Sequence, residues 1–242
     1  MAIRRIHRYP DPDDLADGVA RRLVRDLAGI QEAGAVAQLC LTGGRIAQRM
    51  YARFAAHAKG ALHSDQLELW WGDERFLPSS DPDRNAGPTL EILGSLGLSP
   101  ALTHSMPGSD GILDGAQAAS TYAKELGDTA FDICLLGMGP DGHVASIFPD
   151  HPSSDPPIAK VIEVTEAPKP PAERISLTVP VLNNSREVWF LVTGHDKADA
   201  VARAVAGDET LPGGRISGTV ATRFFLDVAA CEGLPVPYHC EL

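Results

Sequence analysis

Residues 131–143 read FDICLLGMGPDGH, and the order of structural elements is clearest around this stretch. The run 131–136 is the most apolar strand-like segment of the chain, which predicts a buried strand. A loop with three glycines follows the run and ends at His143. Glycine permits tight bends and a close approach of the backbone to a ligand. We therefore expect a strand that carries a ligand-binding loop at its end.

The same order of a strand followed by a polar turn occurs twice earlier in the chain. Residues 36–41 and 67–71 form apolar runs, and each run ends at a turn that contains glycine. Further strands are expected near 160–164, 174–179, 187–192 and 222–226. Apolar residues also recur at helical spacing, at Leu15, Val19, Leu23 and Leu27, at Ile46, Met50, Phe54 and Ala58, and at Ile112, Ala116, Ala119, Ala123 and Leu126. One more helix is expected near 197–205.

The alternation of strands and helices predicts an α/β fold, with a mainly parallel open sheet that carries helices on both faces. The proline-containing stretches 78–88, 149–157 and 168–171 are expected to be loops by composition. The stretches 149–157 and 168–171 resemble linkers, but strands resume on both sides, so we expect surface loops over an active site. The prediction is a single domain over residues 1–242.

Three polar motifs follow predicted strands, directly after residues 41, 71 and 136. In open parallel sheets, ligands bind beyond the carboxyl ends of the strands. The three motifs are therefore expected to meet at one edge of the sheet and to form a functional site there.

The first motif is Thr42-Gly43-Gly44-Arg45, between a strand and a helix. Unpaired amides at the start of a helix, together with glycines that allow a close approach, form an anion site that usually takes phosphate. A tight turn with a helix cap explains the same residues, because a glycine pair alone is weak evidence. The GK[ST] ending of a Walker loop is absent.

The second motif is Gly72-Asp73-Glu74-Arg75, after a strand that ends in two tryptophans. The functional interpretation is that Asp73 and Arg75 present a carboxylate and a guanidinium to a substrate. The alternative is a solvated loop held by salt bridges, because charged residues usually lie exposed.

The third motif is the loop that ends at His143. Histidine exchanges protons near neutral pH, so His143 is a candidate general base. Asp141, two residues earlier in the same loop, is predicted to belong to the substrate-binding residues. The alternative is a structural histidine that is hydrogen-bonded within its loop.

Two further cations stand at strand ends. Arg174 opens a predicted strand, and Lys197 follows another strand at the start of a helix. Each alone would be a surface charge by default. Together they matter, because an acidic protein that binds phosphate must place several cations near it.

Composition excludes several other classes of protein. The net charge of −11 disfavours nucleic acid and anionic membrane surfaces as partners. The four cysteines form no CxxC pair, and no cluster has the spacing of a metal site. No GxSxG motif supports a serine hydrolase. The N-terminal residues lack a signal-peptide pattern, and no run is long enough to span a membrane, so we expect a cytoplasmic protein.

These motifs can be compared with a known family. The segments LTGGRIAQRMY, LWWGDERFLPSSDPDRNAG, FDICLLGMGPDGHVASIFPDHP and ERISLTVPVLNNSREVWFLVTGHDKADAV resemble the glucosamine-6-phosphate isomerase/6-phosphogluconolactonase family, and within it the 6-phosphogluconolactonases. They occur in the family's order and, with the tail FFLDVAA, spread over nearly the whole chain. The combination of GDER with GMGPDGHxASxFP is highly specific.

The resemblance implies a fold shared with glucosamine-6-phosphate deaminases and similar to ribose-5-phosphate isomerases. It implies hydrolysis of 6-phospho-D-glucono-1,5-lactone to 6-phosphogluconate in the oxidative pentose phosphate pathway, with no metal and no organic cofactor. The expected partner is the small phosphosugar lactone, and the chain is expected to be a monomer or a weak homodimer.

The resemblance also implies roles for the matched residues. His143 is similar to the family's proposed general base, and Asp73 and Arg75 match positions that line the lactone. The Thr42-Gly43-Gly44 loop, Arg174 and Lys197 match positions that hold the phosphate. One departure lies at residues 42–47, where members commonly read SGGSTP. The hydroxyls and the proline that follow the glycines are missing here, and Arg45 can supply a positive charge instead.

Two rival functions remain at the level of sequence. One is an isomerase or deaminase of amino-sugar phosphates, which shares the Asp-Glu pair and the Gly-His loop. Such deaminases place Asn-Glu-Pro after the histidine loop, whereas this chain continues ASIFPDHP, and Arg75 replaces an aromatic residue. The other is a catalytically silent sugar-phosphate sensor, against which the joint presence of His143, Asp73 and Arg75 argues.

Overall fold

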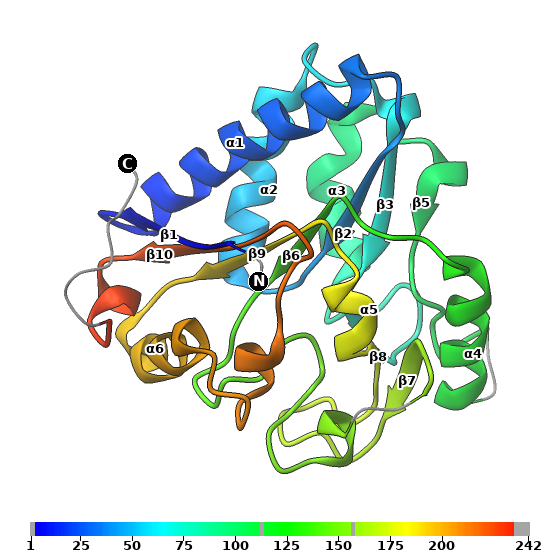
Figure 1. The fold of residues 1–242 in the computed structure, drawn as a ribbon. Helices are drawn as coiled ribbons and strands as arrows, with labels where there is room; N and C mark the ends of the chain where they lie inside the picture. The colour runs from blue at the N-terminus through cyan, green and yellow to red at the C-terminus, as the bar shows by residue number, and fades with distance from the viewer. Residues whose placement is uncertain (1–2, 112–113, 156–157, 235–242) are drawn as a thin grey trace.

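The centre of the molecule is a seven-stranded sheet in which every strand pairs parallel to its neighbours, in the order β1-β10-β9-β6-β2-β3-β5 (Figure 1). The computed structural model describes residues 3–111, 114–155 and 158–234. The strands are β1 (Ile3–Tyr9), β2 (Ala37–Leu41), β3 (Leu67–Trp71), β5 (Thr103–His104), β6 (Ile133–Leu136), β9 (Glu187–Val192) and β10 (Ala221–Asp227). The predicted α/β fold with a mainly parallel sheet is confirmed.

A second, antiparallel sheet has the order β4-β8-β7. Its strands are β4 (Asp73–Arg75), β7 (Val161–Val164) and β8 (Arg174–Leu177). Gly72 alone separates β3 from β4. Its amide donates to the carbonyl oxygen of Leu41 in the large sheet (2.9 Å), and its carbonyl accepts from the amide of Leu177 at the end of β8 (2.9 Å). The chain therefore passes from one sheet to the other at Gly72.

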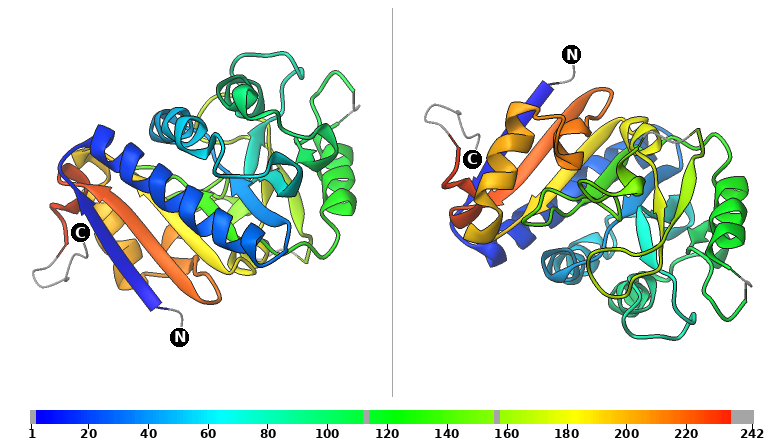
Figure 2. Two further views of the ribbon diagram at one scale, coloured as in Figure 1. Left: turned by 90° about the horizontal axis from the view of Figure 1, so that it is seen from above. Right: turned by 90° about the horizontal axis from the view of Figure 1, so that it is seen from below.

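Helices cover both faces of the large sheet (Figures 1 and 2). Helices α1 (Pro12–Glu32), α2 (Arg45–Ala58) and α3 (Ala86–Leu93) lie on one face. Helices α4 (Gly115–Leu126), α5 (Val179–Asn183) and α6 (Ala198–Ala206) pack into the core on the other face. Helix α4 also packs against the small sheet.

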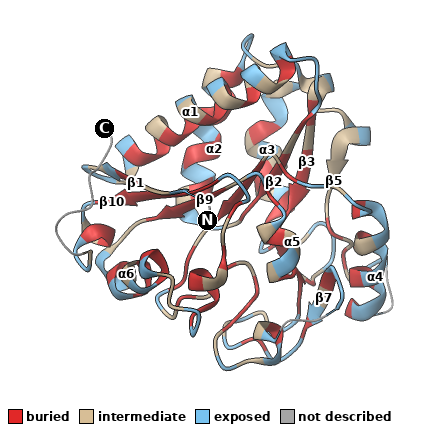
Figure 3. Cartoon of the chain, in the orientation of Figure 1, coloured by how far each residue is buried: buried red, intermediate tan, exposed pale blue. Residues whose placement is uncertain are grey.

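Two large apolar clusters correspond to the two faces. Leu39 and Leu41 of β2 point into the cluster beneath α1 and α2, whereas Cys40 points into the opposite cluster. In β3, Trp71 and Trp70 divide in the same way. Alternate residues of a strand face opposite sides, and a parallel sheet covered on both sides is apolar on both. The central strands are accordingly buried at nearly every position, with Gln38 of β2 and Glu68 of β3 half-buried (Figure 3).

The helix starts differ in a way that matters for the site. The side chain of Asp11 caps α1 by accepting from the amides of Asp13 (2.8 Å) and Asp14 (2.9 Å), as the acidic, proline-containing start predicts. Helix α2 begins after Gly44, which has φ of 103° and provides no side-chain cap. The first amides of α2 are therefore left for another partner.

Some elements differ from the prediction. The edge strand β1 was not expected, because it buries only two neighbouring residues of its seven. Helix α3 begins at Ala86, inside the predicted loop 78–88. The predicted strand 174–179 ends at Leu177, since Pro180 lies in the first turn of α5. Ile112 of a predicted helix lies outside the described residues. No helix in the described part of the chain has the length and apolar character needed to cross a membrane.

Candidate active site

A cleft of about 470 Å³ opens at the carboxyl ends of the central strands. Strands β2 and β6 are neighbours there, and the chain continues from β2 towards β3 on one side and from β6 towards β9 on the other. Such a reversal of strand order leaves a crevice between the diverging loops. The turns that follow β2, β6 and β9 all contribute to the walls of the cleft.

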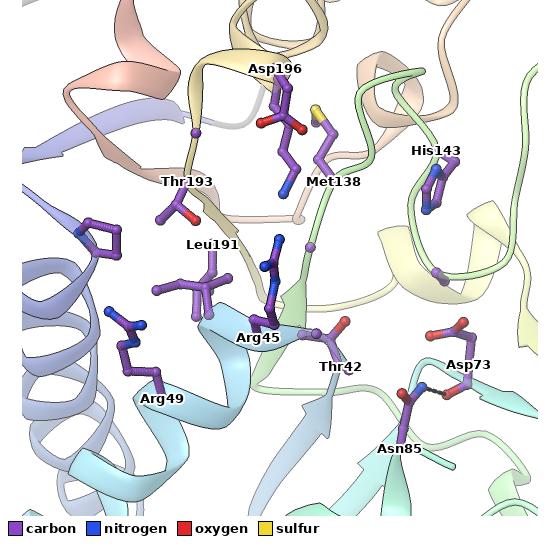
Figure 4. Close-up of a pocket in the computed structure, with 18 of the residues that line it drawn as sticks. Thr42, Arg45, Arg49, Asp73, Asn85, Met138, His143, Leu191, Thr193 and Asp196 are labelled. Carbon is purple, nitrogen blue, oxygen red and sulfur yellow. Dashed lines mark hydrogen bonds between the residues drawn. The ribbon is translucent and has the colours of Figure 1, made fainter. Parts of the chain in front are cut away.

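The predicted site residues converge on this cleft, with one exception. Those that line it are Thr42, Gly43, Gly44, Arg45, Asp73, Arg75, His143, Arg174 and Lys197. Asp141 is not among the lining residues. Figure 4 shows His143 and Asp73 on one side of the cleft and Arg45 and Arg49 on the other. His143 and the carboxylate of Asp73 therefore lie at one end of the cleft, and the guanidinium groups of Arg45 and Arg49 lie at the other.

The imidazole of His143 is held by its own loop. Its Nδ1 lies 2.5 Å from Oδ1 of Asp141, and its ring packs on Phe148 with the centroids 4.8 Å apart. Burial lowers the pKa of His143, the carboxylate of Asp141 raises it, and the nearby ammonium of Lys169 lowers it; the net shift is downward. The neutral imidazole is therefore the dominant form at neutral pH, as a general base requires.

Asp141 lies behind the imidazole instead of facing the cleft. Burial alone raises the pKa of Asp141, but the hydrogen bond and charge of His143 and the charge of Lys169 hold it below its ordinary value. An ionised carboxylate accepts, so Nδ1 of His143 carries the proton and donates. No hydrogen-bond partner of Nε2 is found among the described residues, so that nitrogen is available to a substrate or water.

Asp73 is buried and belongs to a separate network. Its Oδ2 accepts from the Oγ of Ser146 at 2.6 Å. Its backbone carbonyl accepts from Nδ2 of Asn85 at 3.0 Å (Figure 4). Within the described contacts, its carboxylate makes no hydrogen bond to His143. The carboxylate of Asp73 therefore does not hold the imidazole, and a water molecule or a sugar hydroxyl is left as the group that it can orient.

Glu74, between the two predicted site residues, has a structural role. Its carboxylate is fully buried and accepts from the backbone amides of Arg75 (2.8 Å), Asn85 (2.6 Å) and Ala86 (2.9 Å). Nε of Arg84 lies 3.5 Å away. Burial raises the pKa of Glu74, and the amides and Arg84 oppose that rise. The alternative interpretation of a solvated loop is therefore wrong for Glu74, which pairs with Arg84 but is buried within β4.

The two cations of the small sheet lie near Asp73. The guanidinium of Arg75 donates to the carbonyl oxygen of Asp83. Arg174 is buried, and its guanidinium donates to backbone carbonyls of the loop before β8. Burial lowers the pKa of Arg174, and the charge of Asp73 raises it while that of Arg75 lowers it. Arg174 therefore sits beside the Asp73 end of the cleft.

A second group of cations lies at the opposite end. Burial lowers the pKa of Lys197, and the charges of Asp196 and Arg45 act on it in opposite directions. Arg49 also lines this end and forms an ion pair with Asp13 at 3.2 Å. Sequence reasoning missed Arg49. Its position one helical turn after Arg45, on a helix that begins at the site, is the signal that could have found it.

Among the residues that the structure describes, no group of three or more His, Cys, Asp or Glu side chains is arranged to hold a metal ion. The polar groups of the cleft are instead one imidazole, carboxylates and cations. Such a set can move a proton, stabilise a developing negative charge and hold a phosphate.

The chain is similar to several known 6-phosphogluconolactonases. A curated 6-phosphogluconolactonase of Streptomyces coelicolor is 42% identical over 95% of this chain and 94% of its own length. The 6-phosphogluconolactonase of Mycobacterium tuberculosis is 36% identical, over 95% and 98% respectively. Among solved structures, a 6-phosphogluconolactonase of Thermotoga maritima has a TM-score of 0.83 and 26% identity, covering 93% of this chain and 99% of that one.

The fold extends beyond these relatives. A monomeric glucosamine-6-phosphate deaminase has a TM-score of 0.79 at 19% identity, over 95% of this chain and 99% of its own, so it shares the fold alone. A sequence model described as glucosamine-6-phosphate isomerases/6-phosphogluconolactonase matches residues 10–224. The chain belongs to the glucosamine-6-phosphate isomerase/6-phosphogluconolactonase family.

Proposed function

We propose that this chain hydrolyses 6-phospho-D-glucono-1,5-lactone to 6-phospho-D-gluconate, a step of the oxidative pentose phosphate pathway. The observation that carries the proposal is that the two ends of one cleft hold different chemical groups. A neutral imidazole, held through Nδ1 by Asp141, lies at one end, and Arg45, Arg49 and Lys197 lie at the other. A lactone and a phosphate at opposite ends of one sugar match that arrangement. The names of the curated relatives support the same substrate.

Water is the nucleophile in this proposal. Nε2 of His143 takes a proton from a water molecule as the water oxygen attacks the lactone carbonyl carbon. The carboxylate of Asp141 stabilises the imidazolium that forms and keeps the proton of Nδ1 in place. General base catalysis of this kind contributes about 10²–10⁴-fold to the rate. The buried carboxylate of Asp73, fixed by Ser146, orients the water or a hydroxyl of the sugar.

The negative charge of the intermediate requires a cation at the His143 end of the cleft. The guanidinium of Arg75 lines that end, and its backbone is fixed by the pairing of β4 with β8. One well-placed donor to such an oxyanion contributes about 3–4 kcal/mol in other hydrolases. The intermediate then collapses: the bond from the carbonyl carbon to the ring oxygen breaks, and the imidazolium returns its proton to that oxygen.

The phosphate binds at the other end in this scheme. Arg45 and Arg49 project from successive turns of α2, and the open amides at the start of α2 add a partial positive charge. Lys197 approaches from the loop after β9. These cations can bind the phosphate in place of the hydroxyls that are missing after Gly44. Binding the phosphate at a distance fixes the ring for attack.

The site also bears on the domain organisation. Asp73, Arg75 and Arg174 lie on strands of the small sheet, and the other site residues lie in the turns and helices that follow strands of the large sheet. We accordingly propose that residues 1–242 act as one domain.

A cytoplasmic location fits Cys40 and Cys134, which are buried thiols without a disulfide in the described part of the chain, as is usual in reducing compartments.

A lactonase assay tests the proposed function. Freshly generated lactone is mixed with the purified chain, and the rate is corrected for spontaneous hydrolysis. We expect catalysed hydrolysis, and its loss in the His143→Gln variant. Release of ammonia from glucosamine 6-phosphate without lactonase activity would instead identify a deaminase. Binding of 6-phosphogluconate without turnover would identify a sensor.

A further inference from the structure

Lys169 stands next to the catalytic pair without lining the cleft, and sequence reasoning did not single it out. Its Nζ lies 3.2 Å from Nδ1 of His143 and 3.4 Å from Oδ1 of Asp141. The residue belongs to the loop between β7 and β8, on a different segment from the pair it approaches. An ammonium ion this close to both members of a carboxylate–imidazole pair acts on the charge of each.

Arg174 holds the backbone that carries Lys169. Its Nη2 donates to the carbonyl oxygens of Lys169 (3.1 Å) and Pro170 (3.2 Å), and its Nε donates to that of Pro171 (3.1 Å). The guanidinium is itself 5.7 Å from the centroid of the Phe148 ring, on which His143 packs. A buried and rigid guanidinium thus fixes three consecutive carbonyls. Binding of a phosphate by Arg174, as expected from the sequence, would not explain these hydrogen bonds to the backbone.

The position of the protons decides what Lys169 can do. Nδ1 of His143 carries a proton and donates a hydrogen bond to Asp141, so it has no free lone pair to accept a hydrogen bond from the ammonium. Lys169 therefore acts through its charge. The charged groups that face the imidazole are Asp141 on its own loop, Asp73 on β4 and Lys169 on the loop before β8. The two carboxylates favour the imidazolium, and Lys169 opposes it.

We propose that Lys169 is a positioning residue of the lactonase site, whose ammonium keeps Asp141 ionised and His143 neutral, and that Arg174 holds the loop that places it there. The part of this proposal that concerns turnover rests on the proposed function. The part that concerns charge does not, because it describes a relation between three side chains that is measurable without substrate.

The direction of the effect follows from charge. Lys169 lowers the pKa of His143, so removal of its charge raises that pKa. A general base must be neutral, and kcat/KM therefore falls as pH drops through the pKa of His143 in the free enzyme. Without Lys169, this acid limb moves to higher pH. Above the limb, kcat stays within about fivefold of wild type, because an ammonium that is partly exposed contributes at most about 1 kcal/mol.

The test compares Lys169→Met, which removes the charge, with Lys169→Arg, which keeps it. Lys160→Met is the matched control, because it removes an exposed ammonium that pairs with Asp128 (2.8 Å) and does not line the cleft. Two readouts are taken for each variant. One is the pH dependence of kcat and KM for lactone hydrolysis. The other is the titration of the His143 ring by NMR, assigned through the missing signal in His143→Gln.

The proposal expects that Lys169→Met shifts both the NMR titration and the acid limb to higher pH, while Lys169→Arg and Lys160→Met follow wild type. An unchanged NMR titration in Lys169→Met overturns it and leaves Lys169 as a surface charge. A raised KM with an unchanged pH profile also overturns it, since Lys169 would then contact substrate. If wild type shows no lactonase activity but the NMR shift occurs, the proposed function fails and the charge relation stands.

Arg174 has its own prediction within the same experiment. If it acts through the Lys169 loop, Arg174→Lys loses the bonds to three carbonyls and shifts the NMR titration of His143 in the same direction as Lys169→Met. If Arg174 serves only as a phosphate contact, Arg174→Lys raises KM and leaves the titration unchanged. That second result would remove Arg174 from the proposal.

Discussion

The replacement Asp141→Asn tests how the imidazole of His143 is held. The carboxylate oxygen lies 2.5 Å from Nδ1, and an asparagine keeps an oxygen acceptor of similar size without the charge. Hydrogen bonds to charged groups contribute about 1.5–3 kcal/mol. The Asp141 side chain is 34% exposed, so we take the lower part of that range, about 1.5–2 kcal/mol. Expressed as a rate, the loss in kcat is about 10- to 30-fold.

The same variant also has a defined pH signature. The carboxylate of Asp141 raises the pKa of His143, so its removal lowers that pKa and moves the acid limb of kcat/KM to lower pH. This is the opposite direction from Lys169→Met. The assay is lactone hydrolysis across the acid range, with circular dichroism as the check on folding. A plateau rate within twofold of wild type, or an acid limb that moves to higher pH, would refute the assigned role of Asp141.

Four further variants test other parts of the proposed site. His143→Gln should lower kcat by about 10²–10⁴-fold with little change in KM, because it removes the base and not a binding group; steady-state kinetics on the lactone check this. Arg45→Met and Arg49→Met should each raise KM about fivefold with little change in kcat, as expected for the loss of an exposed charge. An unchanged KM in both variants would show that the phosphate does not bind at this end of the cleft. Glu74→Ala should lower the free energy of unfolding by about 3–5 kcal/mol, because it leaves Arg84 buried without its partner; urea titration measures this, and a loss below 1 kcal/mol would contradict the structural role.

The sequence predicts the framework of the site because each chemical motif directly follows an apolar strand. The turns after β2, β3 and β6 could be placed at one edge without coordinates, since parallel strands end on the same side. This brings Thr42, Asp73 and His143 together, as the structure bears out. The edge strand β1 was not predicted, because only Ile6 and His7 of this strand are buried, which leaves no apolar period to detect.

What could not be predicted depends on contacts between distant segments. Lys169 approaches His143 from a loop whose carbonyls accept hydrogen bonds from the side chain of Arg174, and no periodicity in sequence records such bonds. Asp141 was placed with the substrate, but its side chain turns towards Nδ1 of the histidine two residues later. Asp73 faces the cleft and Glu74 is buried away from it. This difference likewise depends on the short strand β4, where successive side chains face opposite sides.

The central claim is that one sugar phosphate spans the cleft with its C1 end at His143 and its phosphate at α2. A crystal structure of the chain with 6-phospho-D-gluconate measures this directly. The account predicts an oxygen of the C1 carboxylate about 3 Å from Nε2 of His143, with the phosphate among Arg45, Arg49 and Lys197. A phosphate bound beside Arg174, with the carboxylate at the α2 end, would contradict it.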